Sequence, residues 1–206
     1  IDLEVRGSEV VVLYRTTTNG LYRVRRYDAA SGGSVGSTIT YGSLFDYTDL
    51  EVTPAGVLAV VGASTVDGRV RVRVDEIGVG FTNFTVFGTV YSGDDLEVTA
   101  AGELVVLGTR PDGVVRTRVV DPSDSSWIQF IFGSAYSGDD LEVSASGEVV
   151  VMGTRFSDGL VRVRTGGGVN YRFGTVFSGT DLEVLSSGGL AVMGDRAADG
   201  QVRAAV

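Results

Sequence analysis

Residues 91–98 read Tyr-Ser-Gly-Asp-Asp-Leu-Glu-Val, and residues 136–143 repeat the same eight letters without a change. The tetrapeptide Asp-Leu-Glu-Val at the end of this stretch occurs five times along the chain. Its copies begin at Asp2, Asp49, Asp95, Asp140 and Asp181, at intervals of 47, 46, 45 and 41 residues. Spacing this regular predicts five copies of one structural unit.

Each unit has the pattern of four short β-strands. The tetrapeptide is the first strand, and a nearly continuous apolar run such as Leu104–Thr109 is the second. A strictly alternating stretch such as Arg69–Val74 is the third, and an aromatic, Thr-rich stretch such as Trp127–Phe132 is the fourth. An Asn-Gly or Asp-Gly pair, typical of hairpin turns, separates the second strand from the third in every unit. These pairs are Asn19-Gly20, Asp67-Gly68, Asp112-Gly113, Asp158-Gly159 and Asp199-Gly200.

Four antiparallel strands in about 45 residues match the size of a propeller blade. The order of elements resembles the tryptophan–aspartate repeat propellers, and the five similar repeats resemble tachylectin-type propellers. The resemblance concerns architecture only, because the Trp-Asp and Gly-His signatures are missing. We therefore expect an all-β chain forming one domain over residues 1–206, a five-bladed β-propeller of four-stranded antiparallel blades. The expected repeats are 1–48, 49–94, 95–139, 140–180 and 181–206.

The fifth repeat has room for only three strands, so its blade should lack the outer strand. The last strand, Gln201–Val206, would then present an unpaired edge to which another strand can add. We expect self-association or strand addition there. Two alternatives stay open: a blade that simply has three strands, and a fourth strand supplied from outside this sequence.

Composition excludes several classes of function. The net charge is −9, with 26 acidic and 17 basic residues, which argues against a nucleic-acid partner. Neither cysteine nor histidine occurs, so disulfides and Cys/His zinc sites are excluded, and no cofactor is indicated. No apolar run approaches the roughly 20 residues of a membrane span. Because Ile1 opens directly on a strand pattern, we expect a removed leader and an extracellular or cell-surface location, with a fragment boundary as the alternative.

Two polar positions recur in every repeat and predict structural ion pairs. The acidic set is Glu4, Glu51, Glu97, Glu142 and Glu183, and the basic set is Arg23, Arg71, Arg116, Arg162 and Arg203. A glycine recurs on the strand between them, except in the first repeat, where Tyr14 takes its place. We expect each arginine to lie over that glycine and to pair with a glutamate.

The five repeated Asp residues should lie near the axis of the propeller, where their charges repel. Hydrogen bonds from backbone amides would offset this repulsion, and a hard cation is the alternative, so the metal content stays unknown. Aromatic residues precede these strands, and Tyr91, Tyr136 and Phe177 join the Asp residues as candidate binding residues. Aromatic rings beside acceptors are typical of sugar-binding sites.

The sequence offers no histidine or cysteine for nucleophilic catalysis and no long irregular loop. It therefore predicts a protein that is not an enzyme: a secreted or surface binding or assembly module, associating through the open edge. A multivalent lectin binding glycans is the first alternative. A carboxylate-dependent glycosidase is the second.

Overall fold

The computed structural model describes residues 2–76, 80–174, 177–196 and 201–205, and all regular structure in these ranges is β-strand. The side chains of residues 76, 80, 177–180, 196 and 201–205 are outside the description. The strands form five antiparallel sheets, each built from strands that are consecutive in the chain. This is the arrangement that the repeats predict.

The first sheet contains β1 (Asp2–Arg6), β2 (Glu9–Arg15), β3 (Tyr22–Asp28) and β4 (Ser34–Gly42). The second contains β5 (Phe45–Val52), β6 (Leu58–Ser64), β7 (Val70–Glu76) and β8 (Gly80–Phe87). The third contains β9 (Asp95–Val98), β10 (Leu104–Thr109), β11 (Val115–Val120) and β12 (Trp127–Gly133). The fourth contains β13 (Asp140–Val143), β14 (Val149–Thr154), β15 (Val161–Thr165) and β16 (Asn170–Gly174). The fifth contains β17 (Phe177–Val184), β18 (Leu190–Arg196) and β19 (Gln201–Ala205).

The turn between the first two strands of a sheet shows how the sequence determines local structure. In the second sheet the Gly56 N–H donates to the Thr53 carbonyl at 2.8 Å, and the Val57 N–H donates to the Thr53 hydroxyl at 3.1 Å. Gly56 has a φ of +85°, a conformation that costs glycine little and other residues more. The corresponding Gly102, Gly147 and Gly188 have φ values of +88°, +83° and +82°. The glycine of each repeat therefore marks a turn that the backbone requires.

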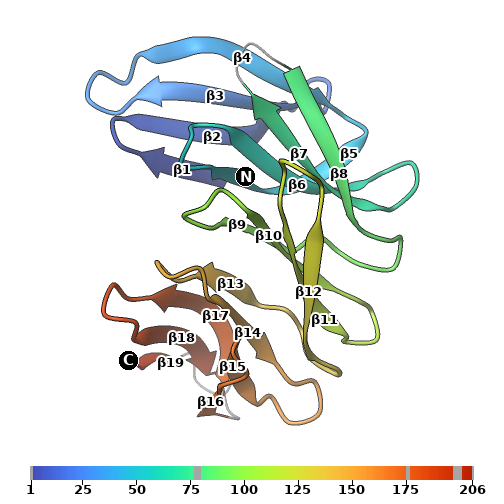
Figure 1. Ribbon diagram of the computed structural model, residues 1–206, viewed down its shortest axis with the longest axis vertical. Helices are drawn as coiled ribbons and strands as arrows, with labels where there is room; N and C mark the ends of the chain where they lie inside the picture. The colour runs from blue at the N-terminus through green and yellow to red at the C-terminus, as the bar shows by residue number, and fades with distance from the viewer. Residues whose placement is uncertain (1, 77–79, 175–176, 197–200, 206) are drawn as a thin grey trace.

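Consecutive sheets pack against one another, and their first strands are neighbours: β1 lies beside β5, β5 beside β9, β9 beside β13, and β13 beside β17. The sheets follow one another along an arc from the N-terminal to the C-terminal end of the chain (Figure 1). Packing of this kind defines a β-propeller, so we call the sheets blades 1 to 5. Between β1 and β17 the described residues form no comparable contact.

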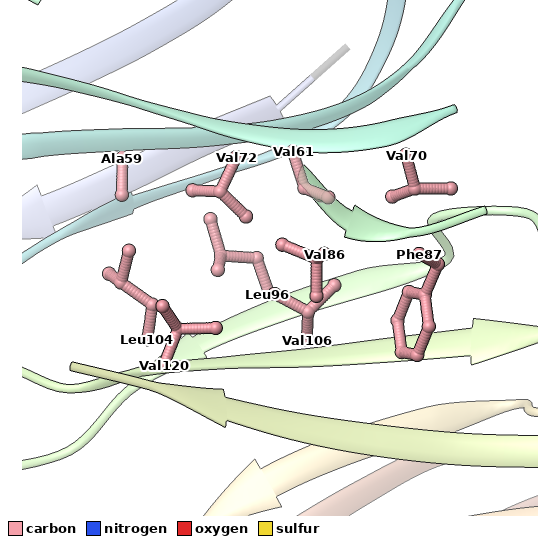
Figure 2. Packing of buried hydrophobic residues seen from close by; sticks show 10 residues of the cluster. All are labelled: Ala59, Val61, Val70, Val72, Val86, Phe87, Leu96, Leu104, Val106 and Val120. Atoms are coloured by element: carbon pink, nitrogen blue, oxygen red, sulfur yellow. The ribbon is translucent and has the colours of Figure 1, made fainter. Parts of the chain in front are cut away.

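The hydrophobic core is divided into four clusters, each between two consecutive blades. Figure 2 shows the cluster between blades 2 and 3, where Phe87 from β8 and Val61 from β6 lie near Leu96 and Val106. Each blade thus has one apolar face toward the preceding blade and one toward the following blade. A single blade buries neither of these faces by itself. The fold is therefore stabilised by the packing of each blade against its neighbours.

Blade 5 has three strands in the order β17-β18-β19, whereas each of the other four has four. This confirms the predicted five-bladed fold with an incomplete last blade. The backbone of β19 pairs with β18 on one side only, and Val206 of the predicted edge lies outside the described residues.

Candidate functional site

The repeated Asp residues connect neighbouring blades through hydrogen bonds. Asp95 accepts the Leu96 N–H of its own blade on Oδ1 at 2.9 Å, and accepts the Leu141 N–H of the following blade on Oδ2, also at 2.9 Å. Three other bonds between blades have the same form, from Leu50 to Asp2 (2.8 Å), Leu96 to Asp49 (2.7 Å) and Leu182 to Asp140 (2.6 Å). We call this series of bonds the Asp relay. The amides of β-strands, rather than those of turns, hold the carboxylates.

The glutamates two positions further along the same strands form a second acidic row. Burial, followed by the neighbouring Glu51 and Glu142 charges, raises the pKa of Glu97 to about 9. Burial together with neighbouring carboxylates raises the pKa of Glu51 to about 8 and that of Glu142 to about 7. Burial, followed by the nearby Asp2 charge, also raises the pKa of Glu4. Glu183 of blade 5 is exposed.

Asp and Glu are the first and third residues of each tetrapeptide, and residues i and i+2 of a strand point to the same side of the sheet. Asp and Glu of each tetrapeptide therefore lie on one side, while in blades 2 to 5 Leu and Val point into the contacts between blades. Burial also raises the pKa of Asp49, with Asp95 and Asp2 as its charged neighbours, and it raises that of Asp140. The row holds protons that free carboxyl groups would release at neutral pH.

The predicted Glu–Arg ion pairs are wrong for the residues that the structure describes. Arg116 lies opposite Gly108, as expected, but Glu97 lies opposite Val105, three residues away along β10. Three residues correspond to about 10 Å along a strand, which is too far for an ion pair. Arg71 instead pairs with Asp67 at 2.7 Å. No ion pair joins the two repeated sets within the described chain.

The repeated arginines stack on the repeated aromatic rings. The guanidinium carbon lies 5.6 Å from the ring centre for Arg116 over Tyr91, and 5.6 Å for Arg162 over Tyr136. The corresponding distance for Arg71 over Phe45 is 5.4 Å. The side chains of Phe177 and Arg203 fall outside the description, and Arg23 lies opposite Tyr14. The sequence carries a signal for this pairing: in blades 2 to 5 the aromatic residue precedes the arginine by 25 or 26 residues.

The same rings are unsuited to binding a ligand. Tyr136 is buried, and its ring packs edge-on against Phe132 with centroids 5.2 Å apart. Tyr91 stacks on Phe87 at 4.9 Å. Of the candidate binding residues, Tyr91 and Tyr136 therefore support the packing between blades, and Asp2, Asp49, Asp95 and Asp140 take part in the relay.

Asp139, the residue before Asp140, has local partners of its own. Asp139 accepts hydrogen bonds from the hydroxyls of Ser137 and Thr154. Within the described ranges no group of three or more acidic residues is placed to hold a metal ion. Those ranges also contain no helix with the length and apolar character that a membrane crossing needs.

A pocket lies between blades 2 and 3. Its volume is about 480 Å³. Pro54, Phe81 and Phe84 contribute apolar walls, and Thr53 and Thr82 contribute hydroxyl groups. A volume of this size suits a small organic ligand.

Comparison with known proteins supports the fold. No protein-family model and no curated protein matches the chain. Among solved structures, hydrazine synthase of Kuenenia stuttgartiensis is similar with a TM-score of 0.75 and 16% identity, over 96% of this chain and 56% of that one. The β-propeller domain of the Trilobed protease from Pyrococcus furiosus is similar with a TM-score of 0.68 and 14% identity, over 99% of this chain and 67% of that one. The Dos1 propeller is similar with a TM-score of 0.62 and 17% identity, over 95% of this chain and 50% of that one.

These similarities define the class of the protein as a β-propeller repeat protein. At such low identity they show the fold alone. The chain spans between half and two thirds of the length of these three neighbours.

The comparison also corrects one prediction. From its lack of histidine, cysteine and long loops, the chain was expected not to be an enzyme. Structures with the same fold include hydrazine synthase, an apocarotenoid oxygenase and virginiamycin B lyase. Repeat-like propeller architecture is therefore no ground for excluding catalysis.

Proposed function

We propose that this chain is a binding or assembly module that associates by strand addition at β19. The observation that carries the proposal is the sheet order of blade 5, in which β19 is the outermost of three strands while the other blades have four. The backbone N–H and C=O groups on the free side of β19 are available to another strand.

Blade 4 supports this proposal by showing what a fourth strand does. There β16 pairs with β15 in antiparallel register, with Arg162 opposite Arg172 and Val163 opposite Tyr171. The residues of β19 include one charge, Arg203, and no proline or lysine to discourage pairing. An extended strand of a partner would occupy the position that β16 has in blade 4.

The test is a variant in which residues 166–174 are repeated after Val206 to supply a fourth strand within the chain. We expect the solution mass of the wild-type chain to rise with concentration, and the extended variant to associate more weakly than the wild type at equal concentration. Amide hydrogen exchange of Gln201–Ala205 should slow in the variant. A Gly/Ser extension of equal length is the control. An extended variant that associates as strongly as the Gly/Ser control contradicts the proposal, and so does a monomeric wild type with a protected β19.

Glycan binding is the second candidate, and the pocket between blades 2 and 3 favours it. The Phe81 ring is exposed beside hydroxyl groups, a combination that suits the faces and edges of a sugar. We expect binding on a glycan array to be lost in Phe81→Ala and retained in Phe156→Ala, another exposed ring. A wild-type chain that binds no glycan removes this candidate. The glycosidase alternative and the extracellular location stay predictions from sequence.

A further inference from the structure

Every contact between blades in this chain joins two different faces. We call the face toward the preceding blade the leading face and the opposite one the trailing face. In blade 4 the leading face presents Leu141 and Val151 to blade 3, and the trailing face presents Met152 and Val163 to blade 5. The same two faces meet at all four junctions. The chain thus makes one type of interface four times.

At one end of the series a leading face is uncovered. Leu3 holds the position of Leu50, Leu96, Leu141 and Leu182, which are all buried, yet it is 53% exposed. Val5, two residues further on β1, is 63% exposed. Val10 and Val12 lie opposite them on β2 and extend the apolar face. These four residues are the leading face of blade 1.

At the other end a trailing face is uncovered. Met193 lies opposite Asp181 in the position that Leu13, Val61, Leu107 and Met152 hold in the other blades. Those four side chains are buried, whereas Met193 is 38% exposed. Asp181 is exposed as well. Its side chain has no blade beyond it within the described residues, so the Asp relay ends there.

The two uncovered faces are therefore the two halves of the interface that the chain already makes. We propose that the leading face of blade 1 is the docking site for the trailing face of blade 5 of a second copy of this chain. In the docked pair Met193 packs on Leu3, as Met152 packs in one cluster with Leu182. The Asp181 carboxylate accepts the Leu3 N–H and continues the Asp relay across the junction.

A second copy suits this site better than closure of one chain on itself. Blades 1 and 5 lie at opposite ends of the arc, apart from each other (Figure 1). Docking between two different faces is head-to-tail association, so each copy keeps one face free for the next. This inference concerns the faces of the blades. It does not depend on strand addition at the edge of β19.

The experiment uses the whole chain and one charged substitution on each face. A buried, unpaired carboxylate is costly, so Leu3→Glu and Met193→Glu should each weaken association at least about 100-fold. We expect light scattering of the strand-extended chain, in which β19 is covered, to show species larger than a single chain, and each substitution made in that chain to leave single chains. Val66→Glu, at an exposed apolar residue of the β6–β7 turn, is the matched control and should associate like the wild type.

Mixing the two variants tests the head-to-tail arrangement. Leu3→Glu keeps an intact trailing face and Met193→Glu an intact leading face, so an equimolar mixture should form a species of two chains. Failure of the mixture to associate overturns the proposal, because a symmetric contact between like faces would not be restored. A wild type that is monomeric at all concentrations overturns it too. Association of the strand-extended chain that neither substitution weakens overturns it in favour of another surface.

Discussion

Asp95 and Leu141 belong to neighbouring blades, and the carboxylate of Asp95 accepts the Leu141 backbone N–H at 2.9 Å. The other oxygen of Asp95 accepts the Leu96 N–H of its own strand. One side chain therefore satisfies two amides and joins two first strands. Similar bonds at the other three junctions make the Asp relay a structural feature of the whole arc of blades.

Replacing Asp95 by alanine should lower the free energy of unfolding by about 0.5–1.5 kcal/mol, because the Leu96 and Leu141 amides each lose one of two carboxylate acceptors. Relief of repulsion among the Asp carboxylates opposes this loss without cancelling it. Urea unfolding measures the change. Asp46→Ala, which removes an exposed carboxylate 3.9 Å from Arg15, should change stability by less than about 0.5 kcal/mol. Equal effects in the two variants would mean that the relay does not stabilise the fold.

The acidic row predicts a protein that is more stable at mildly acidic pH. The pKa of Glu97 is raised to about 9, that of Glu51 to about 8 and that of Glu142 to about 7. The folded chain thus holds protons that the unfolded chain releases above about pH 4.3. Stability from these groups is complete below that pH and is lost as the pH rises toward 9.

We expect the melting temperature to be about 5 °C higher at pH 5.5 than at pH 8.5. Glu97→Gln should raise stability at pH 8.5 and flatten the pH dependence, since it removes one proton-linked group. Glu148→Gln, at an exposed residue, is the control and should leave the slope unchanged. A melting temperature that rises between pH 5.5 and 8.5 would contradict the raised pKa values.

Gly62 should not tolerate a side chain. A Cβ built there would lie 2.7 Å from the Asp46 carbonyl oxygen and 2.9 Å from the Tyr47 Cα, both backbone atoms. Gly62→Ala should therefore cost about 1–3 kcal/mol of unfolding free energy. Gly88→Ala, where nothing lies within 4 Å of the new Cβ, is the matched control. Chemical denaturation measures the unfolding free energy of both variants. A loss in Gly62→Ala alone shows that the contact of the new Cβ with the backbone, rather than the loss of a glycine, lowers the stability.

A double-mutant cycle can measure the arginine–aromatic contact. Arg116→Ala and Tyr91→Leu should show a coupling of about 0.5–1 kcal/mol, because the guanidinium lies over the ring. The cycle of Arg116→Ala with Glu97→Gln should show no coupling, since the register keeps these residues apart. Coupling in the second cycle and not in the first would restore the ion pair that the sequence suggested.

Much of the fold could be predicted because it is encoded locally and five times over. The spacing of Asp-Leu-Glu-Val gives the number of blades, and the Asp-Gly pairs and the alternating strands give the order of elements within each. The missing fourth strand of blade 5 could be seen from the length of the last repeat. The site was less predictable: the Asp residues were found, but amides of neighbouring strands hold them.

The sequence by itself determined the repeat, the strand order and the turns, because these depend on residues close together in the chain and on glycine at positive φ. Only the tertiary structure decided that Arg116 lies over Tyr91 and away from Glu97, since strand register sets that distance. It alone also decided that Leu3 and Met193 are exposed while their equivalents are buried. A buried face depends on which blade lies against it, and identical motifs do not say which blades have a neighbour.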